Sequence, residues 1–204
     1  FLSGGIDSSC VAFLMAQLSR ETIKTFSIGF EDDSYDELKF AREMARLTNS
    51  DHHEEVLNSG RMLEVLPSVI KGLDEPLADA SIIPTYLVSS IARKEVKVVL
   101  GGDGGDELFA GYPTFIGHRL MPFYKRIPRP IRSGIIRPLI ESIPASGKNI
   151  GLNFMAKRFV QGVPYSHEVR HHLWMSYFNF DEIMALLSPD VVKDFSMNGV
   201  LSEI

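Results

Sequence analysis

The chain has 204 residues, of which 45% are apolar and 23% are charged, the ordinary composition of a soluble globular protein. No apolar run approaches the roughly 20 residues of a membrane-spanning helix, so we expect no membrane partner. The net charge of −5 is unevenly distributed, because residues 1–112 carry −9 and residues 113–204 carry +4. An acidic first part argues against nucleic acid as a partner and suits a substrate that binds together with magnesium.

Two features bear on the setting of the protein. It has one cysteine, Cys10, so an internal disulfide is impossible and a cytoplasmic location fits. Cys10 stands in an apolar helical pattern, which predicts a buried core residue rather than a nucleophile. The chain opens on Phe-Leu-Ser-Gly-Gly, which is typical of the end of a strand already in progress, so we expect a piece of a longer protein.

Residues 1–112 alternate between strand and helix patterns. In chain order these are a strand end at 1–2, a helix at 7–20, a strand at 24–30, a helix at 34–48, a strand at 51–57, helices at 59–71 and 83–95, and an apolar strand at 96–100. Ser34 and Glu37 form a capping box for the second helix. Such alternation predicts an α/β domain with a doubly wound parallel sheet, covered by helices on both faces.

The pattern changes after Tyr112, which places a boundary between an α/β core at 1–112 and a mainly helical extension at 113–204. Residues 122–148 contain five prolines, and five basic residues lie between Lys125 and Arg137, a composition typical of a solvated connector. Residues 165–204 are predicted to be helical. Six aromatic residues are expected to pack the core of this part: Phe154, Phe159, Trp174, Tyr177, Phe178 and Phe180.

The segment Leu2-Ser3-Gly4-Gly5-Ile6-Asp7-Ser8 lies between a strand end and a helix start. Glycines let the backbone approach an anion closely, serines offer hydroxyl donors, and the N–H groups of a helix N-terminus favour phosphate. The segment therefore predicts a phosphate cradle, in which a branched side chain at Gly4 would fill the phosphate space. The alternative is a plain Gly-Gly turn with an N-capping serine or aspartate.

Asp7 distinguishes this segment from the common P-loop. A P-loop carries a lysine that neutralises phosphate charge, whereas this segment carries a carboxylate. A carboxylate beside a polyphosphate is repelled unless a cation lies between them, so Asp7 predicts bound Mg²⁺.

A second glycine-rich segment, Gly101-Gly102-Asp103-Gly104-Gly105-Asp106-Glu107, follows the predicted strand at 96–100. In open α/β sheets ligands bind beyond the carboxyl ends of the strands, so both segments are expected at the same edge. Three carboxylates within five residues are costly unless a metal ion or another cation offsets them. The alternative is an acidic surface loop.

With these motifs the sequence resembles the N-type ATP pyrophosphatases, whose pyrophosphate loop has the pattern SGGxDS. LGGDGGDELFAGY at residues 100–112 and DEPLADASIIPTYL at residues 74–87 are similar to the glutamine-dependent asparagine synthetase branch. SGGxDS alone would admit GMP synthetase, NAD synthetase, argininosuccinate synthetase and tRNA-modifying relatives. The resemblance implies a doubly wound sheet of the adenine nucleotide alpha hydrolase type, followed by a helical C-terminal portion.

The resemblance also implies the roles of individual residues. ATP and its pyrophosphate would be bound by nine of them: Leu2, Ser3, Gly4, Gly5, Asp7, Ser8, Ile28, Gly101 and Gly102. Mg²⁺ would be held by Asp7 and Asp106. Asp103 occupies the position where many members carry a catalytic glutamate, and its shorter side chain is a departure from the family pattern. Glu107 and the loop at residues 74–79 are expected near the carboxylate substrate.

The implied activity is that of a carbon–nitrogen ligase. ATP adenylates the side-chain carboxylate of aspartate, AMP and pyrophosphate are released, and ammonia from glutamine completes asparagine. Family members carry an N-terminal glutaminase domain and, further along, a catalytic lysine, and neither is found in this sequence. We therefore expect the 204 residues to bind ATP without turning it over. A homodimer is compatible with the resemblance.

Three other functions remain open from the sequence. An amidotransferase of the same branch would amidate another carboxylate, such as a cell-envelope sugar acid. A non-catalytic nucleotide-binding module is favoured by the missing lysine. A sulfur-inserting tRNA enzyme is disfavoured by the acidic first part and the single cysteine. The pairs His52-His53 and His171-His172 are not predicted to bind metal, because adjacent histidines point in different directions.

Overall fold

The structure is a computed structural model, and it describes residues 1–32, 36–75, 77, 79–144, 151–178 and 180–192. The chain divides into two compact units, Phe1–Gly111 and Tyr112–Ile204.

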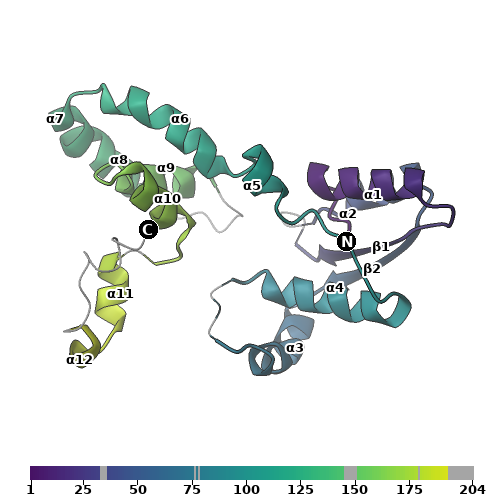
Figure 1. The fold of residues 1–204 in the computed structure, drawn as a ribbon. Helices are drawn as coiled ribbons and strands as arrows, with labels where there is room; N and C mark the ends of the chain where they lie inside the picture. The colour runs from purple at the N-terminus through teal and green to yellow at the C-terminus, as the bar shows by residue number, and fades with distance from the viewer. Residues whose placement is uncertain (33–35, 76, 78, 145–150, 179, 193–204) are drawn as a thin grey trace. The chain divides into compact units, whose positions relative to one another are not determined.

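The first unit is built on two parallel strands (Figure 1). β1 (Lys24–Phe30) pairs with β2 (Asp51–Leu57), in a register that runs from Lys24 opposite Asp51 to Phe30 opposite Leu57. Three successive residues of β1, from Thr25 to Ser27, are buried, as expected of a strand that is covered on both faces.

Helices cover both faces of the strand pair, as Figure 1 shows. α1 (Ile6–Leu18) and α2 (Leu38–Leu47) lie on one side, and α3 (Ser59–Lys71) and α4 (Ile82–Glu95) lie on the other. The buried residues of the first side are Leu2, Ala12, Ile23, Ala41 and Ala45. Those of the second side are Phe26, Leu57, Val65, Val69, Leu87, Val88 and Ala92.

The strands predicted at residues 1–2 and 96–100 are not present as strands. The Leu2 N–H donates to the Phe26 carbonyl at 2.9 Å, and the Phe1 nitrogen donates to the Leu100 carbonyl at 2.5 Å. Isolated bonds of this kind do not build a ladder, which needs consecutive pairs. Within the described residues the parallel sheet therefore has two strands, and the predicted doubly wound sheet is not confirmed.

Local capping explains where the helices of this unit begin. α3 begins at Ser59 as predicted, because the Asn58 side chain accepts a hydrogen bond from the Arg61 N–H at 2.8 Å. α2 begins at Leu38, later than predicted, and Asp36 accepts a hydrogen bond from the Leu38 N–H at 3.3 Å. Ser34, the predicted cap, lies outside the described residues. Cys10 is exposed on α1, so the prediction of a buried cysteine was wrong.

The second unit is helical. Its elements are α6 (Pro113–Lys125), α7 (Arg129–Ile131), the π-helical turn η1 (Arg132–Ile136), α8 (Arg137–Glu141), α9 (Leu152–Gln161), α10 (His167–Met175), α11 (Phe180–Leu186) and α12 (Pro189–Val192). None of the helices in the described part of the chain is long and apolar enough to span a membrane.

Much of the predicted connector is therefore helical, and its prolines show why. Pro130 lies in the first turn of α7, where a missing N–H costs little, whereas Pro138 lies within the continuous helical run of α7, η1 and α8. Just before Pro138 the helix widens into the π-helical turn, in which the Arg137 N–H donates to the Arg132 carbonyl.

Aromatic packing joins α6, α9 and α10. Tyr124 meets Phe159 edge to face at 5.2 Å, and Phe159 stacks on Trp174 at 5.9 Å. By contrast, Phe154, Tyr177 and Phe178 are at least half exposed, so they are not the core residues that the sequence predicted. The side chain of Phe180 lies outside the described part of the chain.

Candidate functional site

Ser3 and Ser8 shape the first glycine-rich loop. Their Oγ atoms are 3.0 Å apart, the Ser3 N–H donates to Ser8 Oγ at 3.2 Å, and the Gly5 N–H donates to Ser3 Oγ at 3.2 Å. Ser8 is buried, and its hydroxyl also lies within donating distance of the Gly5 carbonyl, at 3.3 Å. The two hydroxyls thus hold the loop conformation, so that an anion here would be met largely by backbone groups.

Gly4 lets this loop pack on α2. Its φ is 88°, and a Cβ at this position would lie 2.6 Å from the Phe40 Cβ and 2.7 Å from the Ala41 nitrogen. Only glycine suits both the left-handed conformation and the close approach. A side chain at Gly4 would therefore strike α2 first, which corrects the expectation that it would fill the phosphate space.

The N-terminus of α1 has no side-chain cap. Gly5 is the N-cap residue and provides no side-chain cap, so the first-turn N–H groups have no partner within the helix. These N–H groups and the helix dipole favour an anion at this point. Asp7 lies in the same first turn and adds a carboxylate.

The second glycine-rich loop packs directly against Asp7. A Cβ at Gly102 would lie 2.7 Å from the Ser8 nitrogen and 3.0 Å from the Asp7 Cβ. A Cβ at Gly105 would overlap the Asp7 carboxyl carbon. The structure therefore brings together two segments that are far apart in the sequence, and glycine is what permits their contact.

The other two aspartates of the site also lie in this loop. Asp103 is exposed, and its carboxylate folds back towards Gly101, where a Cβ would overlap its Oδ2. Asp106 lies in the first turn of α5 (Gly105–Phe109), and its carbonyl accepts a hydrogen bond from the Gly111 N–H at 3.0 Å. Asp7 and Asp106 thus occupy the first turns of two helices, which follow the two loops.

Asp7 and Asp106 are of the chemical type that magnesium prefers as a ligand. Mg²⁺ commonly takes one or two protein carboxylates and completes its shell with substrate phosphates and water. Within the described residues no group of three or more His, Cys, Asp or Glu side chains is arranged to hold a metal. A magnesium site at Asp7 and Asp106 would therefore need the substrate phosphates as further ligands.

The remaining predicted residues are placed differently. Leu2 is 1% exposed and packs in the core between α1 and α2, so only its backbone can face a ligand. Ile28 packs against the core on the side of α3 and α4. Glu107 is exposed. Of the loop at 74–79, residues 76 and 78 lie outside the described part, and Asp79 accepts a hydrogen bond from the Ser81 N–H at 2.9 Å.

The two histidines of β2 are part of the sheet packing. His52 Nδ1 lies 2.8 Å from the Thr25 hydroxyl, and the His53 ring stacks on Phe26 at 5.2 Å. Burial lowers the pKa of His52, although the nearby Glu54 opposes this effect. These contacts give each imidazole a structural role within the first unit.

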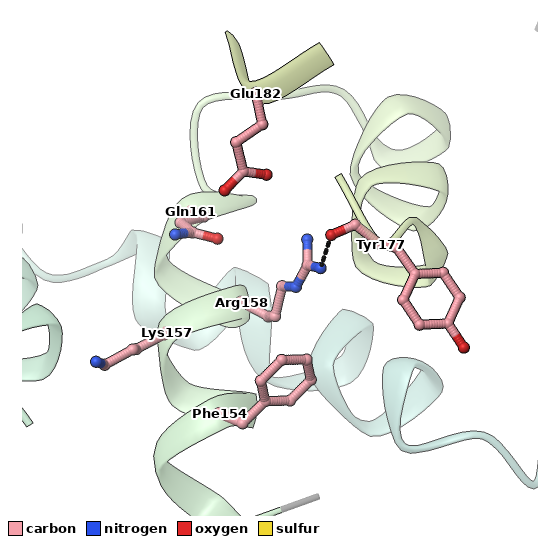
Figure 2. A pocket seen from close by; sticks show the side chains of 6 residues that line it. All are labelled: Phe154, Lys157, Arg158, Gln161, Tyr177 and Glu182. Carbon is pink, nitrogen blue, oxygen red and sulfur yellow. Dashed lines mark hydrogen bonds between the residues drawn. The ribbon is translucent and has the colours of Figure 1, made fainter. Parts of the chain in front are cut away.

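Two hollows lie among the described residues, and the first borders Phe1 and Leu100, which directly precede the two glycine-rich loops. One, of about 270 Å³, lies in the first unit between β1 and residues 96–100. The other, of about 200 Å³, lies in the second unit and contains Arg158 (Figure 2). Arg158 donates to the carbonyls of Leu173, Ser176 and Tyr177 at 2.7–3.2 Å. Its guanidinium therefore caps the end of α10, which is a structural role.

Sequence reasoning missed the contact between Gly105 and Asp7. The run of four glycines between Gly101 and Gly105 was a signal of close backbone approach. The pattern does not reveal which group approaches, because that depends on packing between distant segments.

A parallel α/β unit that presents two glycine-rich loops at helix N-termini is characteristic of phosphate-binding proteins. The family can be stated more closely. The family model described as asparagine synthase matches residues 1–185, and the chain belongs to this family.

Individual relatives agree with this assignment. A putative glutamine-hydrolysing asparagine synthetase of Methanocaldococcus jannaschii is 41% identical over 97% of this chain and 36% of its own length. A putative enzyme of the same name from Mycobacterium tuberculosis is 36% identical over 70% of this chain and 22% of its own length. Asparagine synthetase 1 of Bacillus subtilis is 35% identical over 67% of this chain and 21% of its own length. The chain thus spans between a fifth and little more than a third of these relatives.

Proposed function

We propose that this chain is the ATP-using part of a glutamine-dependent asparagine synthetase. A carboxylate oxygen of aspartate attacks the α-phosphorus of ATP, and the bond to pyrophosphate breaks. Ammonia then attacks the acyl carbon, and AMP leaves with the carboxylate oxygen. Ammonia would come from a glutaminase domain outside these 204 residues.

The observation that carries the proposal is the contact of Asp7 with Gly102 and Gly105. It joins the N-terminus of α1, which has no side-chain cap, to the second loop, and it gathers backbone donors and carboxylates at one place. A polyphosphate needs both, since the donors bind its oxygens and the carboxylates hold the cation that neutralises it.

Individual residues would divide the work as follows. Ser3, Gly4, Gly5 and Ser8 would position the pyrophosphate through the backbone of their loop. Gly101 and Gly102, with Leu2 and Ile28, would border the adenosine. Asp7 and Asp106 would hold Mg²⁺, which neutralises developing charge on the pyrophosphate when it is bound. Asp103, exposed beside Gly101, would face the reacting carboxylate.

Pyrophosphate release by the whole protein tests this function. With ATP, magnesium and glutamine or ammonium present, we expect release that depends on aspartate and yields asparagine and AMP. Release that depends on another carboxylate would favour an amidotransferase with a different acceptor. Binding of ATP without release under any acceptor would favour a nucleotide-binding module.

Replacing Asp7 tests the magnesium assignment. Asp7→Asn removes one charged ligand and keeps the shape of the side chain, so we expect Mg·ATP to bind at least roughly tenfold more weakly, about 1.4 kcal/mol. Calorimetric titration of the 204-residue chain with and without magnesium measures this. Glu43→Gln, which removes one charge at an exposed position of α2, is the control and should bind as the unchanged chain does. Equal affinities for both variants would refute the role of Asp7.

A further inference from the structure

Three histidines gather in the helical unit, away from the glycine-rich loops. The His118 ring of α6 lies 4.0 Å from the His167 ring and 5.3 Å from the His171 ring, both of α10. His118 Nε2 and His171 Nδ1 are 3.2 Å apart, within hydrogen-bond distance. His118 also packs on Trp174 at 4.7 Å. These three residues, His118, His167 and His171, are the histidine cluster.

We propose that the histidine cluster makes the packing of α6 on α10 pH-sensitive, so that the helical unit is tightly packed while the imidazoles are neutral and loosens when they are protonated. The hydrogen bond between His118 and His171 requires one ring to donate and the other to accept. Two imidazolium rings can only donate, so protonation of both removes this bond and places two positive charges in contact.

Charged groups around the cluster favour the neutral form. The three helices that pack here, α6, α9 and α10, contain one acidic residue, Glu168. Glu168 is exposed, and hydrogen bonds from its own N–H and the Ser166 hydroxyl lower its pKa, so it serves the helix N-terminus. The cations on the same helices are Arg119 and Lys125 of α6, Lys157 and Arg158 of α9, and Arg170 of α10, and His172 of α10 is a further imidazole.

Burial also favours the neutral form of His118. His118 Nδ1 is inaccessible to solvent and has no hydrogen-bond partner among the described residues. A proton added to a buried ring nitrogen without an acceptor is poorly solvated. Burial first, and then His167, His171 and Arg170, lower the pKa of His118 from 6.5 to about 4.

The sign of the pH effect follows from this shift. A group whose pKa is lower in the folded protein than in the unfolded protein contributes its full stabilisation when the pH is above the unfolded-state pKa. This stabilisation is lost as the pH falls towards the folded-state pKa. Between pH 6.5 and about 4, one extra proton binds the unfolded chain, so the folding equilibrium constant of the helical unit falls by up to roughly tenfold per pH unit.

The test is urea unfolding of the 204-residue chain between pH 7 and 4.5, followed by the fluorescence of Trp174. Trp174 is the only tryptophan and contacts His118, so it reports on this cluster. The free energy of unfolding of His118→Gln should depend less on pH than that of the unchanged chain. The difference should correspond to the uptake of up to one proton on unfolding. His172→Gln, at an exposed position of α10, should leave the pH dependence unchanged. Identical pH profiles for His118→Gln and the unchanged chain would overturn the proposal.

A second measurement covers the case in which His118→Gln does not fold. Imidazole proton resonances of the unchanged chain can be titrated by NMR. One histidine should titrate below pH 5. It should be the histidine whose ring protons show through-space NMR contacts to the Trp174 ring. Titration of that histidine at the ordinary value for imidazole would overturn the proposal as well.

Discussion

Gly105→Val should abolish nucleotide binding, with Mg·ATP affinity reduced by roughly a hundredfold or more, about 2.7 kcal/mol. The reason is steric, because a Cβ at this position would overlap the Asp7 carboxyl carbon. Valine must push Asp7 and the second loop apart, so the first turn of α1, which contains Asp7, no longer packs against that loop. Calorimetric titration with Mg·ATP measures the loss.

Gly104 and Gly134 provide controls for this prediction. Gly104 has a φ of 87° and open space around a Cβ, so Gly104→Ala strains the same loop without touching Asp7. It should cost stability, on the order of 1 kcal/mol, while most of the nucleotide affinity is kept. Gly134→Val, where a Cβ meets nothing within 4 Å, should change neither quantity. If Gly105→Val binds Mg·ATP as tightly as Gly134→Val, the contact between the loops has no part in binding.

The first unit shows which elements a sequence can predict. β1, β2 and α3 begin and end at the predicted residues, and for β1 and α3 the signals are local, namely the apolar residues of KTFSIGF and the Asn58 cap. The apolar run at 96–100 was equally strand-like, yet it forms no ladder among the described residues. Strand pairing depends on a neighbour, and no local pattern specifies whether that neighbour is present.

The site shows the same division. The two glycine-rich motifs identified the residues that meet around Asp7, since glycine at those positions signals close approach. The sequence does not predict which group each glycine contacts. Gly4 contacts α2 and Gly105 contacts Asp7, and both contacts arise from tertiary packing. The histidine cluster was missed for a related reason. His171 was judged beside its neighbour His172, whereas its contact is His118 on another helix.

Replacing Arg170 should give the largest loss of stability in the helical unit. Arg170 is 5% exposed, and its guanidinium donates to the Gly162 carbonyl at 2.9 Å and to the Tyr165 carbonyl at 2.6 Å. Both carbonyls lie in the turn between α9 and α10. Burial lowers the pKa of this guanidinium, with weak opposition from Glu168, so the hydrogen bonds must offset the cost of desolvation.

Arg170→Met keeps most of the apolar stem of the side chain and removes its donors. Two carbonyls then lose the guanidinium donor, and that of the buried Gly162 keeps the longer hydrogen bond from the Tyr165 N–H, at 3.3 Å. Relief from burying a charge offsets part of this cost, so we expect a net loss of roughly 2–4 kcal/mol. The stability of Arg170→Lys should lie between that of the unchanged chain and that of Arg170→Met. A single ammonium cannot donate to both carbonyls as the planar guanidinium does. Arg119→Met, at an exposed position, should stay within about 0.5 kcal/mol of the unchanged chain. Urea unfolding at pH 7, followed by Trp174 fluorescence, measures all three variants. Equal stabilities for Arg170→Met and Arg119→Met would show that the turn closes without the guanidinium.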